Sequence, residues 1–167
     1  MPPIYRRYDE ENGTVMRKTD CTCEYAFGED SPYESGGAGL ISCVEDYVKV
    51  PAALANGGVS PITGERILSM RTIDLMRTNL MNETMAKDYS LSLRGYGYGL
   101  GVRTHITKAH GVLSSLGEFG WDGAAGSFFL VDPEANVALF AAQYLRNPYN
   151  SFAPYRYVNQ FYSILEK

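Results

Sequence analysis

The sequence predicts an α+β fold in which an antiparallel β-sheet is flanked by helices. A glycine-rich segment, 117–133, continues into an apolar run, and a five-residue turn, 132–136, separates this run from a second one, 137–144. Two such runs around a short turn indicate a β-hairpin. Helical patterns, with apolar residues three and four positions apart, occur both before and after this hairpin. They begin near Ser42, Ser69 and Pro154.

Composition and charge are those of an ordinary globular domain. Hydrophobic residues make up 45% of the 167 residues and charged residues 20%, which favours one domain with its own core over disorder or a membrane span. The net charge is −4, and no basic run is longer than Arg6-Arg7, which disfavours nucleic acid and anionic membranes as partners. We expect one domain over 1–167, composed of a ribbon and loop (1–34), a helical part (35–94) and a sheet with a closing helix (95–167).

The cysteines Cys21, Cys23 and Cys43 indicate reduced thiols rather than a metal site. Their number is odd, and Cys-x-Cys without a nearby histidine is a poor zinc pattern. The first residues lack the charged and apolar regions of a secretory signal. For the chain as written we expect a cytoplasmic setting, no metal and no cofactor.

The amino-terminal part is expected to form a β-ribbon followed by a loop. Residues 4–9 and 14–18 alternate weakly around Asn12-Gly13, and this dipeptide is the strongest hairpin signal in the chain. Residues 19–34 show no periodicity. We therefore expect a loop there.

The first helix is expected to begin at Ser42, because Ser42-x-x-Glu45 is a capping box. Pro51 lies inside the helix and should bend it. Asn56-Gly57-Gly58 should end it, since these residues tolerate the left-handed conformation. The expected buried face consists of Val44, Tyr47, Val48, Pro51, Ala52 and Ala55.

Later segments predict a second helix, a strand, a loop and a closing helix. The second helix has Ser69 as N-cap and an apolar face of Ile73, Met76 and Leu80. In 95–102, glycines alternate with larger residues, so we expect a strand with one bare face against which another segment packs. Residues 104–116 should be a polar loop. Its histidines, His105 and His110, are expected to be solvated. The closing helix has Pro154 in its first turn and an apolar stripe of Tyr155, Val158, Phe161, Tyr162 and Leu165.

Several blocks, in order, resemble the penicillin-recognising serine hydrolases, a family that includes class C β-lactamases and carboxylesterases of the same fold. Ser-Gly-Gly-x-Gly-Leu at 35–40 precedes a helix that ends at Asn-Gly-Gly, although Pro51 stands near the family's usual Phe. Arg-Ile-Leu-Ser at 66–69 and the glycine-tyrosine strand at 95–101 follow. The resemblance covers 35–167, and it implies part of a β-lactamase/transpeptidase-like fold.

Trp121-Asp122-Gly123 matches the Trp-x-Gly triplet of the esterase-like members of this family. The resemblance implies that the triplet opens a strand beside the catalytic serine, and that the backbone N–H of Ala124 completes the oxyanion hole. Such a donor stabilises a transition state by about 3 kcal/mol. From the residues alone, the spacing of Gly120, Gly123 and Gly126 indicates either the edge of a site or a tight hairpin entry.

The motifs that supply the nucleophile in this family are absent from the sequence. No serine has a lysine three residues later, and a serine is activated only by an adjacent base. Tyr157-Val158-Asn159 fits the pattern of the second motif, Tyr-x-Asn, but it lies out of order on the closing helix. No Gly-x-Ser-x-Gly elbow is present either. No catalytic residue is therefore assigned to this chain.

Two functions remain open on this basis. The chain is either the carboxyl-terminal part of an ester- or amide-cleaving serine hydrolase, whose missing amino-terminal half carries the nucleophile, or a degenerate half-domain that binds a partner without catalysis. An unrelated α+β binding module is a third possibility. The family's sheet normally includes two strands from the missing half, so we expect an exposed edge beside 137–144 and a tendency to form a homodimer.

Overall fold

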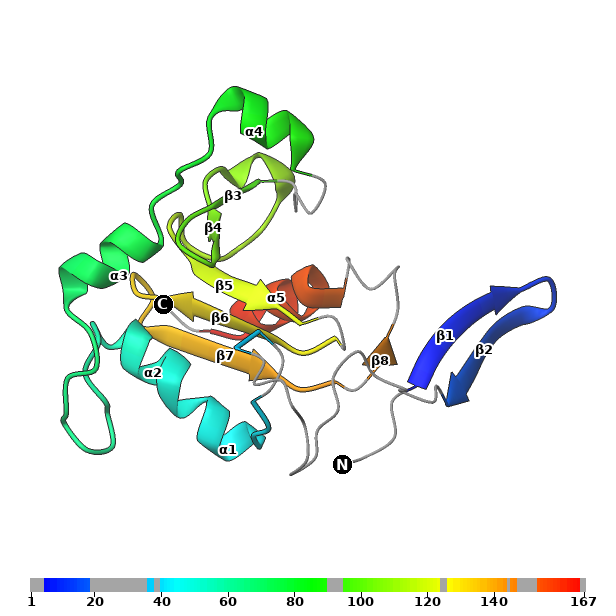
Figure 1. Ribbon diagram of the computed structural model, residues 1–167, viewed down its shortest axis with the longest axis horizontal. Helices are drawn as coiled ribbons and strands as arrows, with labels where there is room; N and C mark the ends of the chain where they lie inside the picture. The colour runs from blue at the N-terminus through cyan, green and yellow to red at the C-terminus, as the bar shows by residue number, and fades with distance from the viewer. Residues whose placement is uncertain are drawn as a thin grey trace.

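A five-stranded antiparallel sheet forms the centre of the protein (Figure 1). The structure is a computed structural model that describes residues 5–18, 36–37, 40–89, 95–123, 126–143, 145–146 and 153–165. The strand order is β3-β4-β5-β6-β7, which confirms the expected α+β class. The strands are β3 (Tyr96–Tyr98), β4 (Arg103–His105), β5 (Phe119–Asp122), β6 (Phe128–Asp132) and β7 (Val137–Ala141).

Helices cover both faces of this sheet, because its strands alternate apolar side chains between the two faces. On β6, Phe129 and Val131 pack toward the helices that precede the sheet, and Phe128 and Leu130 pack toward the closing helix. The first face carries α1 (Val44–Tyr47), α2 (Lys49–Ala55) and α3 (Met70–Met76), and the second carries α5 (Ala153–Ser163) (Figure 1).

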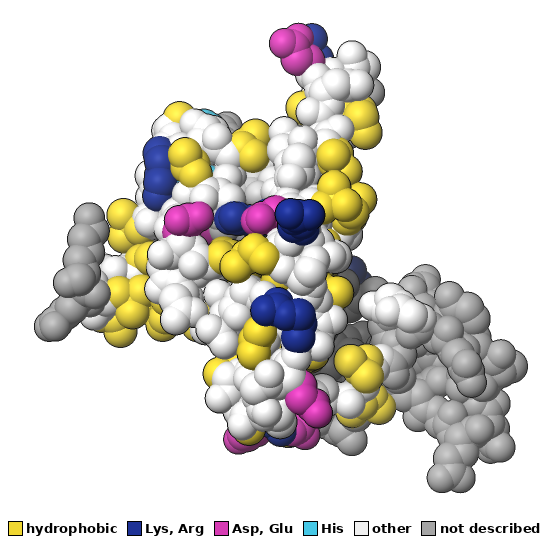
Figure 2. All heavy atoms as spheres, turned by 90° about the vertical axis from the view of Figure 1, so that its left-hand side faces the viewer, with side chains coloured by type: hydrophobic (Ala, Val, Ile, Leu, Met, Phe, Trp, Pro, Cys, Tyr) yellow, Lys and Arg dark blue, Asp and Glu magenta, His cyan; other side chains and the backbone are white. Residues whose placement is uncertain are grey.

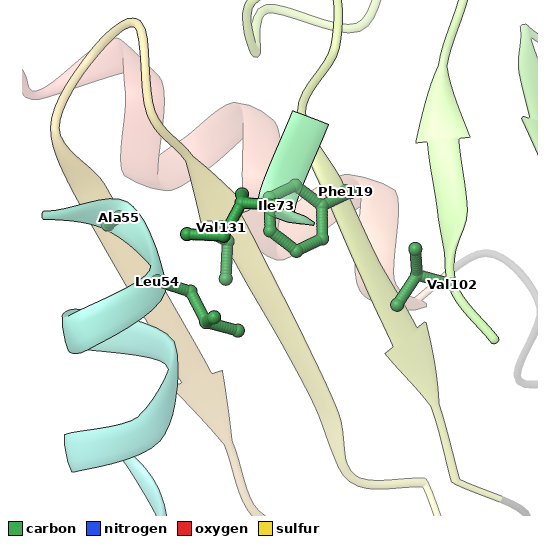
Figure 3. Packing of buried hydrophobic residues seen from close by; sticks show 6 residues of the cluster. All are labelled: Leu54, Ala55, Ile73, Val102, Phe119 and Val131. Atoms are coloured by element: carbon green, nitrogen blue, oxygen red, sulfur yellow. The ribbon is translucent and has the colours of Figure 1, made fainter. Parts of the chain in front are cut away.

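The core of the first face joins segments that are far apart in the sequence. Phe119 and Ile73 are fully buried there, and Leu54 reaches them from α2 (Figure 3). Leu54 was not part of the predicted apolar stripe, whereas the predicted Val44 is exposed. The rest of the predicted stripe is borne out, because Pro51 and Ala55 are buried and Tyr47, Val48 and Ala52 are half-buried.

The capping box predicted at Ser42 is wrong. The N-cap of α1 is Cys43, without a side-chain capping bond, and the Ser42 hydroxyl instead donates to the carbonyl of Cys43 at 3.3 Å. The interruption at Val48 lies three residues before Pro51, whose missing N–H leaves the preceding turn without one of its bonds. The stop at Asn56 is confirmed, because Gly57 and Gly58 follow it with φ of 64° and 84°.

The predicted N-cap at Ser69 is confirmed, since its side chain accepts from the amide of Thr72 at 3.1 Å. Helix α3 ends at Met76, however, so Leu80 lies beyond it and is half exposed. A further short helix, α4 (Glu83–Asp88), follows with Asn82 as its N-cap. The sequence pattern had not indicated this helix, which has no residue in either core cluster among the described residues.

Replacing Ser69 with alanine is expected to lower the free energy of unfolding by about 1 kcal/mol, because the amide of Thr72 loses its acceptor. The matched control is Ser42→Ala, which removes no capping bond and should change stability by less than about 0.5 kcal/mol. Urea denaturation of the two variants measures the difference. Equal losses would show that the Ser69 cap contributes nothing.

The bare face predicted for residues 95–102 is confirmed. An added Cβ at Gly97 would lie 2.3 Å from the side chain of Asn79, and one at Gly99 would lie 2.0 Å from the carbonyl of Met76. The strand itself is shorter than expected. It ends at Tyr98, since the amide of Gly99 bonds to Val102 and closes a turn into β4.

The predicted ribbon forms a small separate sheet. Strand β1 (Tyr5–Glu10) pairs with β2 (Gly13–Lys18) in antiparallel register and with β8 (Leu145–Arg146) in parallel, in the order β2-β1-β8. Glu11 and Asn12 fill the turn, and Gly13 starts the return strand with φ of 121°. The ribbon extends away from the main sheet (Figure 1). The loop expected at 19–34 lies outside the described residues.

The hairpin of β6 and β7 and the closing helix follow the prediction closely. Asp132 pairs with Val137, so the loop has four residues, and Asn136 adopts φ of 53° within it. On α5, Val158 is buried and the half-buried Tyr162 packs beside it, whereas Leu165 lies beyond the last helical turn. Within the described ranges, no helix is long and apolar enough to cross a membrane.

Candidate functional site

Among the described residues, strand β5 has no partner along one side at its carboxyl end, which is called its open end below. It pairs with β4 only at Phe119 and Gly120, whereas its pairing with β6 continues to Asp122. The amide of Gly123 then donates to the carbonyl of Ser127 on the β6 side, at 2.6 Å. Because successive amides of a strand point to opposite sides, the amide of Asp122 points toward the open side.

The structure places three of the four predicted site residues at this open end. Trp121 and Asp122 are half-buried at the end of β5, and Gly123 is exposed just beyond it. Ala124, whose amide the resemblance assigns to the oxyanion hole, lies outside the described residues. The assignment of that amide therefore stays a prediction.

The glycines near the triplet have two different structural roles. A Cβ at Gly120 would lie 2.0 Å from the carbonyl of Phe129, so Gly120 allows β6 to approach closely. Gly126 adopts φ of 92°, which belongs to the turn between β5 and β6. Both observations favour the tight hairpin entry of the two readings, and they position Trp121 and Asp122 at the open end.

An aromatic ring packs against Trp121, and a second one packs against the first. The ring of Tyr98 meets it edge-on, with centroids 5.4 Å apart and an angle of 67° between the planes. Tyr89, just after α4, lies 5.6 Å from Tyr98. Trp121 itself is half-buried.

Asp122 faces the other side of the strand and pairs with a buried arginine. Its carboxylate lies 3.1 Å from Nη1 of Arg103, which comes from β4. Burial raises the pKa of Asp122, and the charge of Arg103 opposes this effect. The sequence analysis had named Asp122 only as the middle residue of the triplet, without a partner.

A network of buried polar side chains continues behind Asp122. Glu118 is fully buried and accepts from the hydroxyl of Tyr96 at 2.6 Å and from that of Ser114 at 3.0 Å. Arg103 lies 3.9 Å from its second oxygen, and the Tyr96 ring lies under the guanidinium at 5.4 Å. Burial raises the pKa of Glu118. Burial and the nearby charge of Glu118 both raise the pKa of Tyr96.

Sequence reasoning missed Arg103 and Glu118. The available signal was the spacing of Glu118, Gly120 and Asp122, because alternate residues of a strand lie on one face. Two carboxylates on one apolar strand require a cation nearby. The strand that supplies it becomes known only with the sheet register, which places Arg103 opposite Gly120.

His105, expected in a solvated loop, is instead a buried residue of β4 with 1% exposure. Burial lowers its pKa. Its Nδ1 lies 3.1 Å from the Ser114 hydroxyl, but this hydroxyl donates directly to Glu118 and is itself fully buried. The three residues therefore lack both the relay order and the access that a serine nucleophile needs. His110 is exposed, as expected.

The out-of-order Tyr157-Val158-Asn159 pattern is accounted for by packing. Asn159 accepts from the amide of Leu113 and donates to the carbonyl of Gly111, both at 3.0 Å, so it ties α5 to the segment before β5. Val158 is buried in the second core cluster. These contacts favour a structural role for the triplet.

Asp132 anchors the same region from the end of β6. It is fully buried, and burial raises the pKa of its carboxyl, but hydrogen bonds from Tyr162, Ser115 and Ala135 outweigh burial and lower it. The Tyr162 hydroxyl donates at 2.6 Å and the amide of Ser115 at 2.9 Å. The charged carboxylate is therefore the form that the folded protein stabilises.

The Tyr162→Phe change is expected to destabilise the protein by about 1.5–3 kcal/mol near neutral pH, because a charged acceptor loses a donor. A lowered pKa contributes stability above the unfolded value, about 4, and this contribution is lost as pH falls through the folded value. The loss caused by Tyr162→Phe should therefore shrink on acidification. Urea midpoints measured from pH 7 to pH 3, with the exposed Tyr157→Phe as control, test this dependence, and a constant difference would contradict it.

Among the described residues, no group of three or more histidine, cysteine, aspartate or glutamate side chains is arranged to hold a metal ion. Of the three cysteines, Cys43 is described, and it is an exposed free thiol.

Comparison with known families matches residues 4–156 to the Beta-lactamase family. The match covers most of the chain and includes the β5 segment with its Trp-x-Gly triplet. The protein belongs to the Beta-lactamase family. The antiparallel sheet and the helices that flank it agree with this membership.

Two curated relatives come from Mycobacterium tuberculosis. Uncharacterized protein MT1414 of strain CDC 1551 / Oshkosh and Protein Rv1367c of strain H37Rv are each 31% identical over 112 residues, which is 63% of this chain. The aligned part is 27% of each relative. This chain thus spans about a quarter of their length.

Solved structures share the fold at low sequence identity. Unliganded simvastatin synthase from Aspergillus terreus, as its selenomethionyl derivative, has a TM-score of 0.72 at 16% identity, over 99% of this chain and 42% of that one. EstCE1, described as a hydrolase with promiscuous acyltransferase activity, has a TM-score of 0.67 at 20% identity, over 96% and 43%. In both, the chain aligns with less than half of the solved protein.

Proposed function

We propose that this chain forms the oxyanion side of the active site in a serine hydrolase that cleaves esters or amides by acyl transfer. The observation that carries the proposal is the open end of β5. Trp121 and Asp122 pair with β6 there but have no partner on β4. A backbone amide exposed at such an edge can donate to an oxyanion. The structural neighbours, one described as a synthase and the other as a hydrolase with promiscuous acyltransferase activity, support this class of reaction.

The nucleophile is proposed to come from outside this chain. The sequence has no Ser-x-x-Lys, and in the part of the chain that the structure describes, the serine that contacts both a histidine and a carboxylate, Ser114, is fully buried. Each similar structure is more than twice as long as the part that this chain matches, which leaves room for a front half that carries the motif. We infer that the isolated chain does not catalyse this reaction on its own.

An exposed apolar surface supports a missing front half. Large hydrophobic side chains on and after α3 are about half exposed, and Figure 2 shows hydrophobic side chains among charged ones on this side of the protein. We propose that these side chains contact the missing segment, since larger exposed apolar patches mark contact with another protein segment. The side chains are Met70, Leu75, Leu80 and Met85.

The edge of the main sheet offers a second contact. Strand β7 is the last in the sheet order, and among the described residues β1 pairs with β8 rather than with β7. Unpaired edges recruit strands. In the absence of a front half, we expect the chain to self-associate, with a mass by light scattering that rises with concentration. A clean monomer at high concentration would show that the edge is protected.

Co-expression tests the proposed function. The chain is produced with and without an upstream segment of the same genomic locus that carries Ser-x-x-Lys and Tyr-x-Asn, and hydrolysis of p-nitrophenyl acetate and nitrocefin is measured. Activity that requires both parts, and that a Ser→Ala change in the upstream motif abolishes, supports the proposal. The alternative function, a non-catalytic binding module, is supported if no such upstream segment is encoded or if the pair binds without turnover.

A further inference from the structure

We propose that Arg103 is a positioning residue for the oxyanion strand, because its guanidinium ties Asp122 across the point where β4 and β5 separate. The two strands are paired through Arg103 and Gly120, and the described register gives Trp121 and Asp122 no partner on β4. The 3.1 Å ion pair is the side-chain link that crosses this opening. The inference deepens the proposed function and rests on it for its catalytic meaning.

The register explains why an arginine can form this link. Arg103 is opposite Gly120, and Glu118 and Asp122 lie two residues before and after Gly120 on the same face. Diagonal neighbours across an antiparallel pair lie within reach of a long side chain. The guanidinium thus has a carboxylate on each side, at 3.1 Å from Asp122 and 3.9 Å from Glu118.

The guanidinium is itself held in place. The Arg103 side chain is 4% exposed and rests over the Tyr96 ring, while Glu118 is fixed by hydroxyls of Tyr96 and Ser114. A planar fork can address two carboxylates at once, whereas a lysine ammonium is a single point of charge on a flexible stem. Within the described part, Nε of Arg103 and Oε1 of Glu118 have no hydrogen-bond partner. The buried charge of Arg103 is therefore stabilised by its ion pairs with Asp122 and Glu118.

The ion pair between Arg103 and Asp122 links the buried polar network to the position of the proposed oxyanion donor. An oxyanion donor acts only when it lies at about 2.7–3.1 Å from the developing charge. A misplacement of about 1 Å can cost on the order of 100-fold in rate. Loosening the strand end at Asp122 should therefore lower kcat and leave KM nearly unchanged, because an oxyanion donor acts on charge that develops in the transition state and not in the bound ground state.

Trp121 provides a reporter that does not depend on activity. It is the only tryptophan of the chain and is next to Asp122, so its fluorescence and its quenching by acrylamide report directly on the strand end. The variants are Asp122→Asn, which keeps size and removes charge, and Arg103→Lys, which keeps charge and removes the fork. The matched control is Asp46→Asn, which removes an exposed ion pair with Lys49.

We expect both variants to raise the acrylamide quenching constant at least two-fold in the full chain, with unchanged far-UV circular dichroism, and the control to match the parent. In the co-expressed pair, kcat should fall about 10- to 100-fold with KM within two-fold. Parent-like quenching in folded Asp122→Asn and Arg103→Lys proteins would overturn the inference. If the co-expressed pair shows no serine-dependent turnover, the proposed function fails, while the quenching result still decides whether Arg103 positions the strand.

Discussion

Replacing Phe119 with alanine is expected to lower the free energy of unfolding by about 3–5 kcal/mol. Phe119 is fully buried in the cluster that joins α2, α3 and β5, so its removal leaves a cavity between three elements. Small domains have a total stability of about 5–15 kcal/mol, and this single loss is a large part of it. The urea midpoint should fall accordingly.

The control for this change is Ile164→Ala, because Ile164 is 76% exposed and its loss should cost less than about 0.5 kcal/mol. If Phe119→Ala does not fold well enough to be measured, Phe119→Leu gives a smaller loss in the same direction. A Phe119 variant as stable as the Ile164 variant would show that the first core cluster does not hold the sheet to the helices.

The isolated chain is expected to hydrolyse p-nitrophenyl acetate and nitrocefin no faster than a heat-denatured sample of it. A serine without an adjacent base is a weak nucleophile. Substrate binding and oxyanion donors without that nucleophile provide only a small part of the enzyme's full rate acceleration. The expected difference from the co-expressed pair is several orders of magnitude. Initial rates at matched protein concentration measure it.

A rate that scales with the concentration of the isolated chain, and that a serine-directed inhibitor removes, would contradict this expectation. Ser114 would be the first residue to change, because it contacts both His105 and Glu118. Ser114→Ala provides the control. It should leave the background rate of the isolated chain unchanged.

Local sequence signals predicted those parts of the fold that local chemistry determines. Asn12-Gly13 indicated the ribbon, Ser69 the N-cap of α3, and the Asp132–Asn136 segment the turn between β6 and β7. Each of these signals lies within a few residues of the structure it specifies. Ser42 shows the limit of such signals, because a capping box one residue away from the true N-cap makes different bonds.

The sequence predicted the strand that carries the candidate site, but it did not predict the charged side chains around that strand. Trp121 and Asp122 were identified from a triplet that is contiguous in the sequence. Arg103 lies 18 or more residues away on another strand, and its role depends on a register set by the whole sheet. His105 was misjudged for the same reason, because a short strand with three buried polar residues, 103–105, has the composition of a loop.

The most direct test of the central claim is covalent labelling with a fluorophosphonate, mapped by peptide mass spectrometry. The chain is treated alone and together with the co-expressed upstream segment proposed above, and every labelled serine is located. We expect no specific label on the isolated chain, and in the pair a single labelled serine in the Ser-x-x-Lys motif of the front half, blocked by prior acylation with substrate. Stoichiometric labelling of any one serine of the isolated chain would contradict the claim, because it would reveal an activated nucleophile within these 167 residues.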